Sequence, residues 1–162
     1  GHKTSSDAPT LTYQPTAQQV LQASLMTEEQ CRRVAMHLSP SFLRVCDWTL
    51  LFSTATHGYR LAALYNVIKD STGPSLLCVK DAGGNVFGAF ISSWVAPDNH
   101  GIPYPHFFGS GECFLFQVAP QFQVFNWTEA AQKSDNYDFV LAANECLAFG
   151  GGARQLSDTS LN

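Results

Sequence analysis

The apolar residues of the chain fall at helical spacing in two places. The run Thr27-Glu28-Glu29-Gln30 has the pattern of a capping box, in which the threonine hydroxyl accepts from the third helical amide and Gln30 reaches back. A helix is therefore expected to begin at Thr27 and to be stopped by Pro40. Its apolar face consists of Cys31, Val34, Ala35 and Leu38. A second helix is predicted by Leu61, Leu64, Tyr65 and Ile68, after a turn at residues 56–58, and should end near Asp70.

Short apolar runs between turn signals predict strands in the rest of the chain. The clearest pair is a hairpin, because Gly83 and Gly84 in the turn at residues 81–84 can adopt positive φ. Residues 96–106 and 128–137 are expected to be loops. The predicted strands are residues 48–52 (buried), 76–80, 85–91, 112–118, 122–125, 138–141 and 146–149.

This order of elements predicts an α+β fold, in which short helices pack outside antiparallel sheets. The sequence divides into a polar, partly disordered lead-in over residues 1–26, one domain over residues 27–152, and a polar tail over residues 153–162. The length of 162 residues is suited to a single hydrophobic core.

The charge pattern gives no reason to expect a nucleic-acid partner. The formal net charge is -4, and among the scattered basic residues only Arg32 and Arg33 are adjacent, so no basic stripe could follow a phosphate backbone. No apolar run reaches the roughly 18 residues of a membrane span. No charged start followed by an apolar stretch indicates a secretory signal.

The five cysteines are an odd number and none forms a CxxC pair, so neither a disulfide framework nor a structural zinc site is expected. Free thiols packed as small hydrophobic side chains in a reducing, cytoplasmic environment are the simplest interpretation. The five histidines include no pair at i+4 spacing. No metal, cofactor or catalytic residue is therefore assigned.

Candidate chemistry is confined to a few positions. Gly109-Ser110-Gly111 precedes a predicted strand rather than a helix, so it is interpreted as a turn and not as a phosphate loop. Glu112 is either a structural carboxylate or a general base that lacks an evident partner. Cys113 and Cys146 are candidate redox thiols, although each follows a glutamate, which disfavours the thiolate. The triple glycine at 150–152 is either a mobile turn or a backbone surface that another chain can approach.

Several motifs in this order resemble the TLDc family. The most specific has the form F-G-x-G-E-x-F-x-F and includes Phe108, Gly109, Gly111 and Glu112. The second motif is the triple glycine Gly150, Gly151 and Gly152. We take the named residues of both motifs as family-motif or possible interaction residues. The resemblance runs from about residue 27 to residue 152, over residues 48–52, 56–61, 79–84, 86–89, 107–116 and 147–152.

The resemblance implies a β-sandwich flanked by short helices, without an established catalytic centre. It also implies a cytoplasmic protein that protects cells, neurons especially, from oxidative stress, and several members of the family bind and regulate the vacuolar proton pump (V-ATPase). In the family further strands follow the triple glycine, and residues 153–162 do not resemble them. We therefore expect a truncated, spliced or partial form whose open edges could be covered by a partner or a second copy.

Two functions follow as expectations. The first is a non-enzymatic protein-interaction domain in protection against oxidative stress, acting through subunits of the V-ATPase. The alternative is a thiol-based redox sensor or antioxidant that uses the free cysteines.

Overall fold

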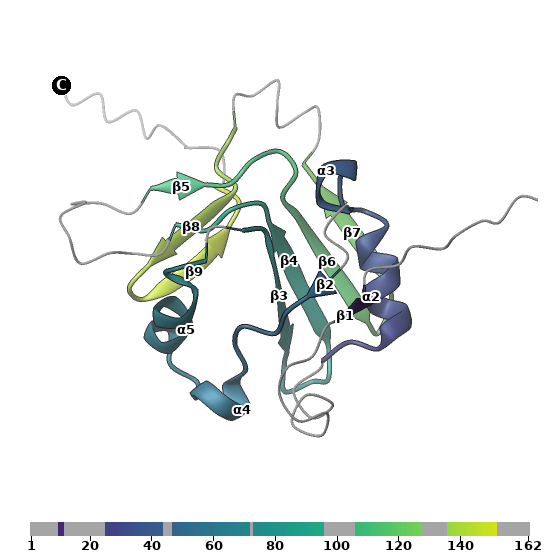
Figure 1. The fold of residues 1–162 in the computed structure, drawn as a ribbon, viewed down its shortest axis with the longest axis horizontal. Helices are drawn as coiled ribbons and strands as arrows, with labels where there is room; N and C mark the ends of the chain where they lie inside the picture. Colours follow the sequence, from purple (N-terminus) through teal and green to yellow (C-terminus); the bar gives the residue numbers. More distant parts are fainter. Residues whose placement is uncertain are drawn as a thin grey trace, which may run out of the picture.

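The computed structural model describes residues 10–11, 25–43, 47–71, 73–95, 106–127 and 136–151, and these form an α+β fold of antiparallel sheets and short helices (Figure 1). The helices are α2 (Glu28–Ala35), α3 (Pro40–Leu43), α4 (Thr54–His57) and α5 (Leu61–Ile68). The strands are β1 (Thr10–Leu11), β2 (Asp47–Trp48), β3 (Ser75–Lys80), β4 (Val86–Ile91), β5 (Phe107–Phe108), β6 (Phe114–Ala119), β7 (Gln123–Asn126), β8 (Val140–Ala143) and β9 (Cys146–Phe149).

The strands form two antiparallel sheets and one short parallel pair. The larger sheet has the order β3-β4-β6-β7, and the smaller has the order β5-β8-β9. β1 and β2 pair in parallel, Thr10 with Asp47 and Leu11 with Trp48. The predicted hairpin is confirmed as β3 and β4, and the strand predicted at residues 146–149 coincides with β9.

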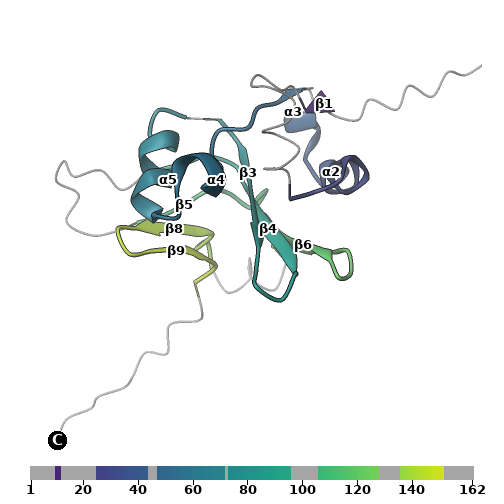
Figure 2. The same cartoon turned by 90° about the horizontal axis from the view of Figure 1, so that it is seen from below.

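Other elements pack against both faces of the larger sheet, as the perpendicular views show (Figures 1 and 2). Val86 and Phe90 of β4 belong to a buried cluster that includes α2. Ala89 and Ile91 point to the opposite face, where they join a second cluster with α5 and β8. Alternate residues of one strand thus serve two separate cores, as the period of two in a strand requires.

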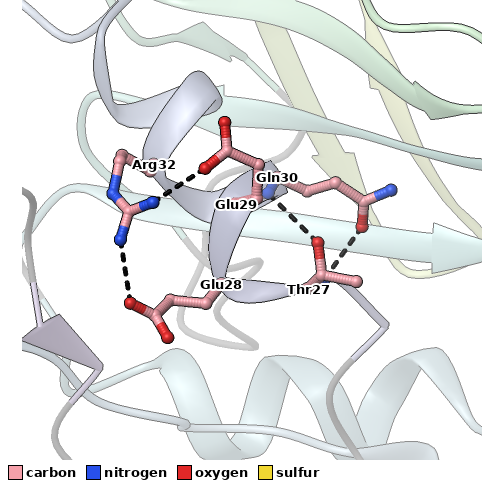
Figure 3. Close-up of polar contacts among 5 residues, drawn as sticks. All are labelled: Thr27, Glu28, Glu29, Gln30 and Arg32. Carbon is pink, nitrogen blue, oxygen red and sulfur yellow. Dashed lines mark hydrogen bonds and ion pairs between the residues drawn. The ribbon is translucent and has the colours of Figure 1, made fainter.

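The predicted capping box is present at the start of α2 (Figure 3). The Gln30 amide donates to the Thr27 hydroxyl at 3.2 Å, and the Thr27 amide donates to the Gln30 side-chain oxygen at 2.8 Å. Arg32 pairs with Glu28 at 2.9 Å and with Glu29 at 2.7 Å on the exposed side of the helix. The cap therefore fixes where the helix begins and so places its apolar face on the sheet.

Replacing Thr27 with alanine should lower the free energy of unfolding by about 1 kcal/mol, because the Gln30 amide loses its acceptor. The measurement is urea unfolding, with Thr49→Ala, a change at another exposed threonine, as the control. Equal midpoints for the two variants would contradict the structural role of the cap.

Two predicted elements between residues 48 and 58 differ from the structure. Residues 48–52 do not form a buried strand, because only Asp47–Trp48 pair with another strand, and Leu50 and Leu51 are 45% and 41% exposed. An apolar run without a hydrogen-bonding neighbour cannot become a strand. The turn at residues 56–58 is the end of the one-turn helix α4, where Gly58 has φ 80°.

Pro40 does not stop the first helix, which already ends at Ala35. It instead opens α3, in the first turn, where a proline needs no amide hydrogen. In the second half of the chain, the strand predicted at residues 112–118 begins at Phe114 rather than at residue 112, and the strand predicted at residues 138–141 is Val140–Ala143. Several predicted segments lie outside the described residues. They are the lead-in except for β1 and residues 25–26, the loops at residues 96–105 and 128–135, and residues 152–162.

Candidate functional site

The first predicted motif forms the connection between β5 and β6. Gly109 has φ 96°, a conformation that favours glycine, and a Cβ there would lie 2.9 Å from the Cys113 sulfur. The Cys113 amide donates to the Ser110 carbonyl at 2.9 Å, which closes the turn. Phe108 packs toward Trp94, with ring centroids 6.1 Å apart.

Gly111 lies directly against the ring of Trp127. A Cβ at Gly111 would be 2.6 Å from the ring atom Cε3, so any larger residue would displace the indole. The indole is held on its other side by a hydrogen bond from its Nε1 to the Asn136 carbonyl at 3.1 Å. The two glycines of the motif therefore allow close packing, which is a structural role.

Glu112 is exposed, in the turn that precedes β6. Its amide donates to the Ser110 hydroxyl at 3.3 Å, and no ion pair between described residues includes its carboxylate. Among the described residues Glu112 therefore has no ion-pair partner, and its side chain is not buried.

The second motif, the triple glycine, is held against residues 136–139. The amides of Gly150 and Gly151 donate to the carbonyls of Phe139 and Asp138 at 2.8 and 2.9 Å. The Asn136 side chain donates to the Gly151 carbonyl at 2.8 Å, and a Cβ on Gly151 would overlap the Asp138 side chain. These contacts fix Gly150 and Gly151 in place. Gly152 lies outside the described residues.

A cavity of about 300 Å³ is lined by residues of both motifs. Cys113 and Leu115 lie on one side of it and Gly150 on another. The remaining walls could not be predicted from the sequence, because they come from segments that are distant along the chain. Those walls include Phe125, Asn126, Trp127, Asn136, Asp138, Phe139 and Phe149.

Trp127 and Phe139 of the cavity wall form an aromatic cluster with the neighbouring Tyr137. The Trp127 ring lies 5.6 Å from Tyr137 and 5.3 Å from Phe139, between ring centroids. In the sequence, the aromatic residues on either side of Asp138 are a local feature that could have indicated this region. The cavity combines aromatic walls with one carboxylate, a composition typical of ligand-binding pockets.

The four described cysteines are free thiols in different surroundings. Cys113 is buried, and the Ser92 amide donates to its sulfur at 3.5 Å. Cys146 is exposed at the start of β9, where its carbonyl accepts from the Tyr65 hydroxyl at 2.8 Å. Burial raises the pKa of the Cys31 thiol, and it raises the pKa of Cys78 to about 11. Cys113 directly precedes β6 and lines the cavity. Cys146 is the first residue of β9, and the last residue of that strand, Phe149, lines the same cavity.

Cys78 should react with an alkylating reagent at least tenfold more slowly than Cys146 at pH 8. With a pKa of about 11, only about one Cys78 thiol in a thousand is ionised at that pH, and the thiolate is the nucleophile. Mass spectrometry of each alkylated peptide gives the two rates. The Cys78 rate should keep rising up to pH 11, and equal rates at pH 8 would contradict the burial of this thiol.

Among the described residues, no group of three or more histidine, cysteine or acidic side chains is placed to hold a metal ion. None of the helices in the described part is long and apolar enough to cross a bilayer.

The comparisons with known proteins agree on one family. The TLDc domain model matches residues 20–161. Oxidation resistance protein 1 of Xenopus laevis is 36% identical over 135 residues, which cover 83% of this chain and 14% of that protein. The human protein of the same name is 33% identical over the same shares. Human nuclear receptor coactivator 7 is 30% identical over 131 residues, 80% of this chain and 12% of that protein. The chain thus spans only a small part of the length of these relatives.

Proposed function

The chain belongs to the TLDc domain family, and we propose on that basis that it is a non-enzymatic protein-interaction domain in protection against oxidative stress. The observation that carries this proposal is the similarity to oxidation resistance protein 1 over 83% of the chain. The whole of each relative is much longer, so the proposal concerns the domain.

The geometry of the motif supports binding over catalysis. Gly109 and Gly111 serve close packing, and Glu112 is exposed without an ion-pair partner among the described residues. The cavity brings aromatic side chains and one carboxylate together at a surface between the two sheets. These are features of a surface that recognises another chain.

We infer the V-ATPase as the partner, in the cytoplasm, from the resemblance to pump-binding members of the family. The test is a pull-down with the purified chain on purified peripheral pump subunits, with a heat-unfolded sample as the control. Retention of a subunit by the folded chain alone supports this partner. Recovery of none would remove the pump from the proposal and leave the interaction domain to be tested separately.

The protective role is tested in cells that lack their own oxidation resistance protein. Survival after hydrogen peroxide should rise when the chain is expressed, and Glu112→Gln should protect as well as the parent, because this carboxylate has no catalytic task. A Glu112→Gln protein that is folded yet does not protect would give this carboxylate a role, in binding or in catalysis.

A second candidate function rests on the exposed thiol of Cys146. A thiol-based sensor or antioxidant needs an accessible, ionisable cysteine. The raised pKa values of Cys31 and Cys78 weigh against those two residues in this role. Only Cys146 is exposed among the described cysteines, so the alternative depends on it most.

A further inference from the structure

Four large apolar side chains lie exposed in a stripe across one face of the larger sheet. Val79 of β3 pairs with Phe87 of β4, and Leu115 of β6 pairs with Phe125 of β7. Phe87 and Leu115 are diagonal neighbours, because Ala89, two residues after Phe87, is the partner of Leu115. These side chains are 37%, 41%, 40% and 49% exposed in the order Val79, Phe87, Leu115 and Phe125.

The other half of the same face is covered. Leu77, Ala89 and Ile91 share this face with the stripe, and they pack in the cluster that contains α5 and β8. The smaller sheet therefore covers part of the larger one and stops short of the stripe. Among the described strands, β9 is the last strand on this side of the smaller sheet (Figure 2).

Among the strands that the structure describes, β9 is an edge of the smaller sheet. Its sequence, Cys-Leu-Ala-Phe, contains no charge and no proline, the residues that usually prevent an edge from pairing with another chain. The cavity lies between the end of β9, at Phe149 and Gly150, and the stripe residues Leu115 and Phe125. Because neighbouring strands are about 4.8 Å apart, a strand added to β9 would extend the smaller sheet over the stripe.

We propose that β9 accepts an extended strand of a partner protein, whose alternate apolar side chains cover the stripe of Val79, Phe87, Leu115 and Phe125. This surface deepens the proposed function, because it names where an interaction domain would bind. The backbone of β9 supplies hydrogen bonds, and the stripe and cavity select apolar side chains.

The charge of the cavity defines the partner further. Asp138 is the one charged residue among the described residues that line it, and none of them is basic. Asp138 lies two residues before β8 and lines the cavity, where its side chain lies close to Gly151. The partner strand should therefore carry a lysine or arginine beside its apolar residues, at the end that reaches Asp138.

The test uses the full chain and a blocked, fluorescently labelled peptide of alternating valine and threonine that ends in arginine. Fluorescence anisotropy should show saturable binding, and hydrogen exchange of the β9 amides should slow when the peptide is bound. A matched peptide with N-methyl groups at alternate positions cannot donate along the strand, and it should bind at least about tenfold more weakly. Equal binding of both peptides would overturn strand addition.

Two substitutions locate the site. Phe125→Ser and Asp138→Asn should each weaken binding about tenfold, since the first removes an apolar contact and the second a charge. Met36→Ser is the control, because Met36 is 77% exposed at the C-terminal cap of α2, which packs on the opposite face. Thermal unfolding verifies that each variant is folded, and unchanged binding by folded Phe125→Ser and Asp138→Asn would overturn the site.

Two other outcomes also overturn the proposal. If the β9 amides of the free monomer are already protected, the chain's own residues occupy this edge. If sedimentation shows a dimer that the peptide does not dissociate, a second copy occupies it. None of these results depends on survival under oxidative stress, so the binding site and the protective role can fail separately.

Discussion

The variant Gly88→Ala should lose about 3 kcal/mol or more of unfolding free energy. Gly88 lies at the centre of β4, opposite Cys78 of β3 and Phe116 of β6. A Cβ there would overlap the Leu77 carbonyl oxygen and lie 2.7 Å from Cζ of the Phe116 ring. The strand backbone would have to move, because the atom in the way is main chain.

Urea unfolding of the purified variant measures this loss. The control is Gly73→Ala, since nothing lies within 4 Å of a Cβ at Gly73 and this change should be nearly neutral. A Gly88→Ala protein as stable as Gly73→Ala would show that β3 and β4 are not as close as the structure has them.

Removing the ring of Phe116 should be comparably harmful. Phe116 is 1% exposed and packs with residues of α2, β4 and β6 in one buried cluster. Truncation to alanine should lower the free energy of unfolding by about 3–5 kcal/mol, because it leaves a cavity as well as losing burial.

Phe87→Ala is the matched control for this prediction. It removes the same ring from the adjacent strand, but Phe87 is 41% exposed on the other face of the sheet. Its loss should be no more than about half that of Phe116→Ala, since much of the ring remains in water. Similar losses for both variants would mean that the core is not where the structure places it.

The elements that the sequence predicted correctly are those that local chemistry determines. The capping box of α2 requires only Thr27 and Gln30, three residues apart. The β3–β4 turn likewise closes on itself, because Asn85 donates to the Asp81 carboxylate from its amide at 2.9 Å and from its side chain at 2.7 Å. Those hydrogen bonds also hold the pKa of Asp81 below its usual range.

The elements that were missed depend on contacts between distant segments. β2 exists because Asp47 pairs with Thr10, and nothing near residue 48 in the sequence announces that partner. The cavity is similar, because it brings Cys113 and Gly150 together with Trp127 and Asp138. The motif residues of the site could be predicted from the family resemblance, but the walls between them required the tertiary structure.

The open stripe could not be predicted from the strand pattern either. Val79, Phe87, Leu115 and Phe125 alternate with their neighbours as core residues do, so the sequence gives no sign that they remain exposed. Exposure depends on how far the smaller sheet extends over the larger one. That extent is a property of the packing between sheets.

The most direct test of the proposed function is the survival of peroxide-treated cells that express the chain with all five cysteines replaced by alanine. Circular dichroism and a cooperative thermal transition first establish that the variant is folded. An interaction domain without enzymatic or thiol chemistry predicts survival equal to that given by the parent chain. Loss of protection by the folded variant would contradict this account and assign the activity to a thiol, with Cys146 the first to test by itself.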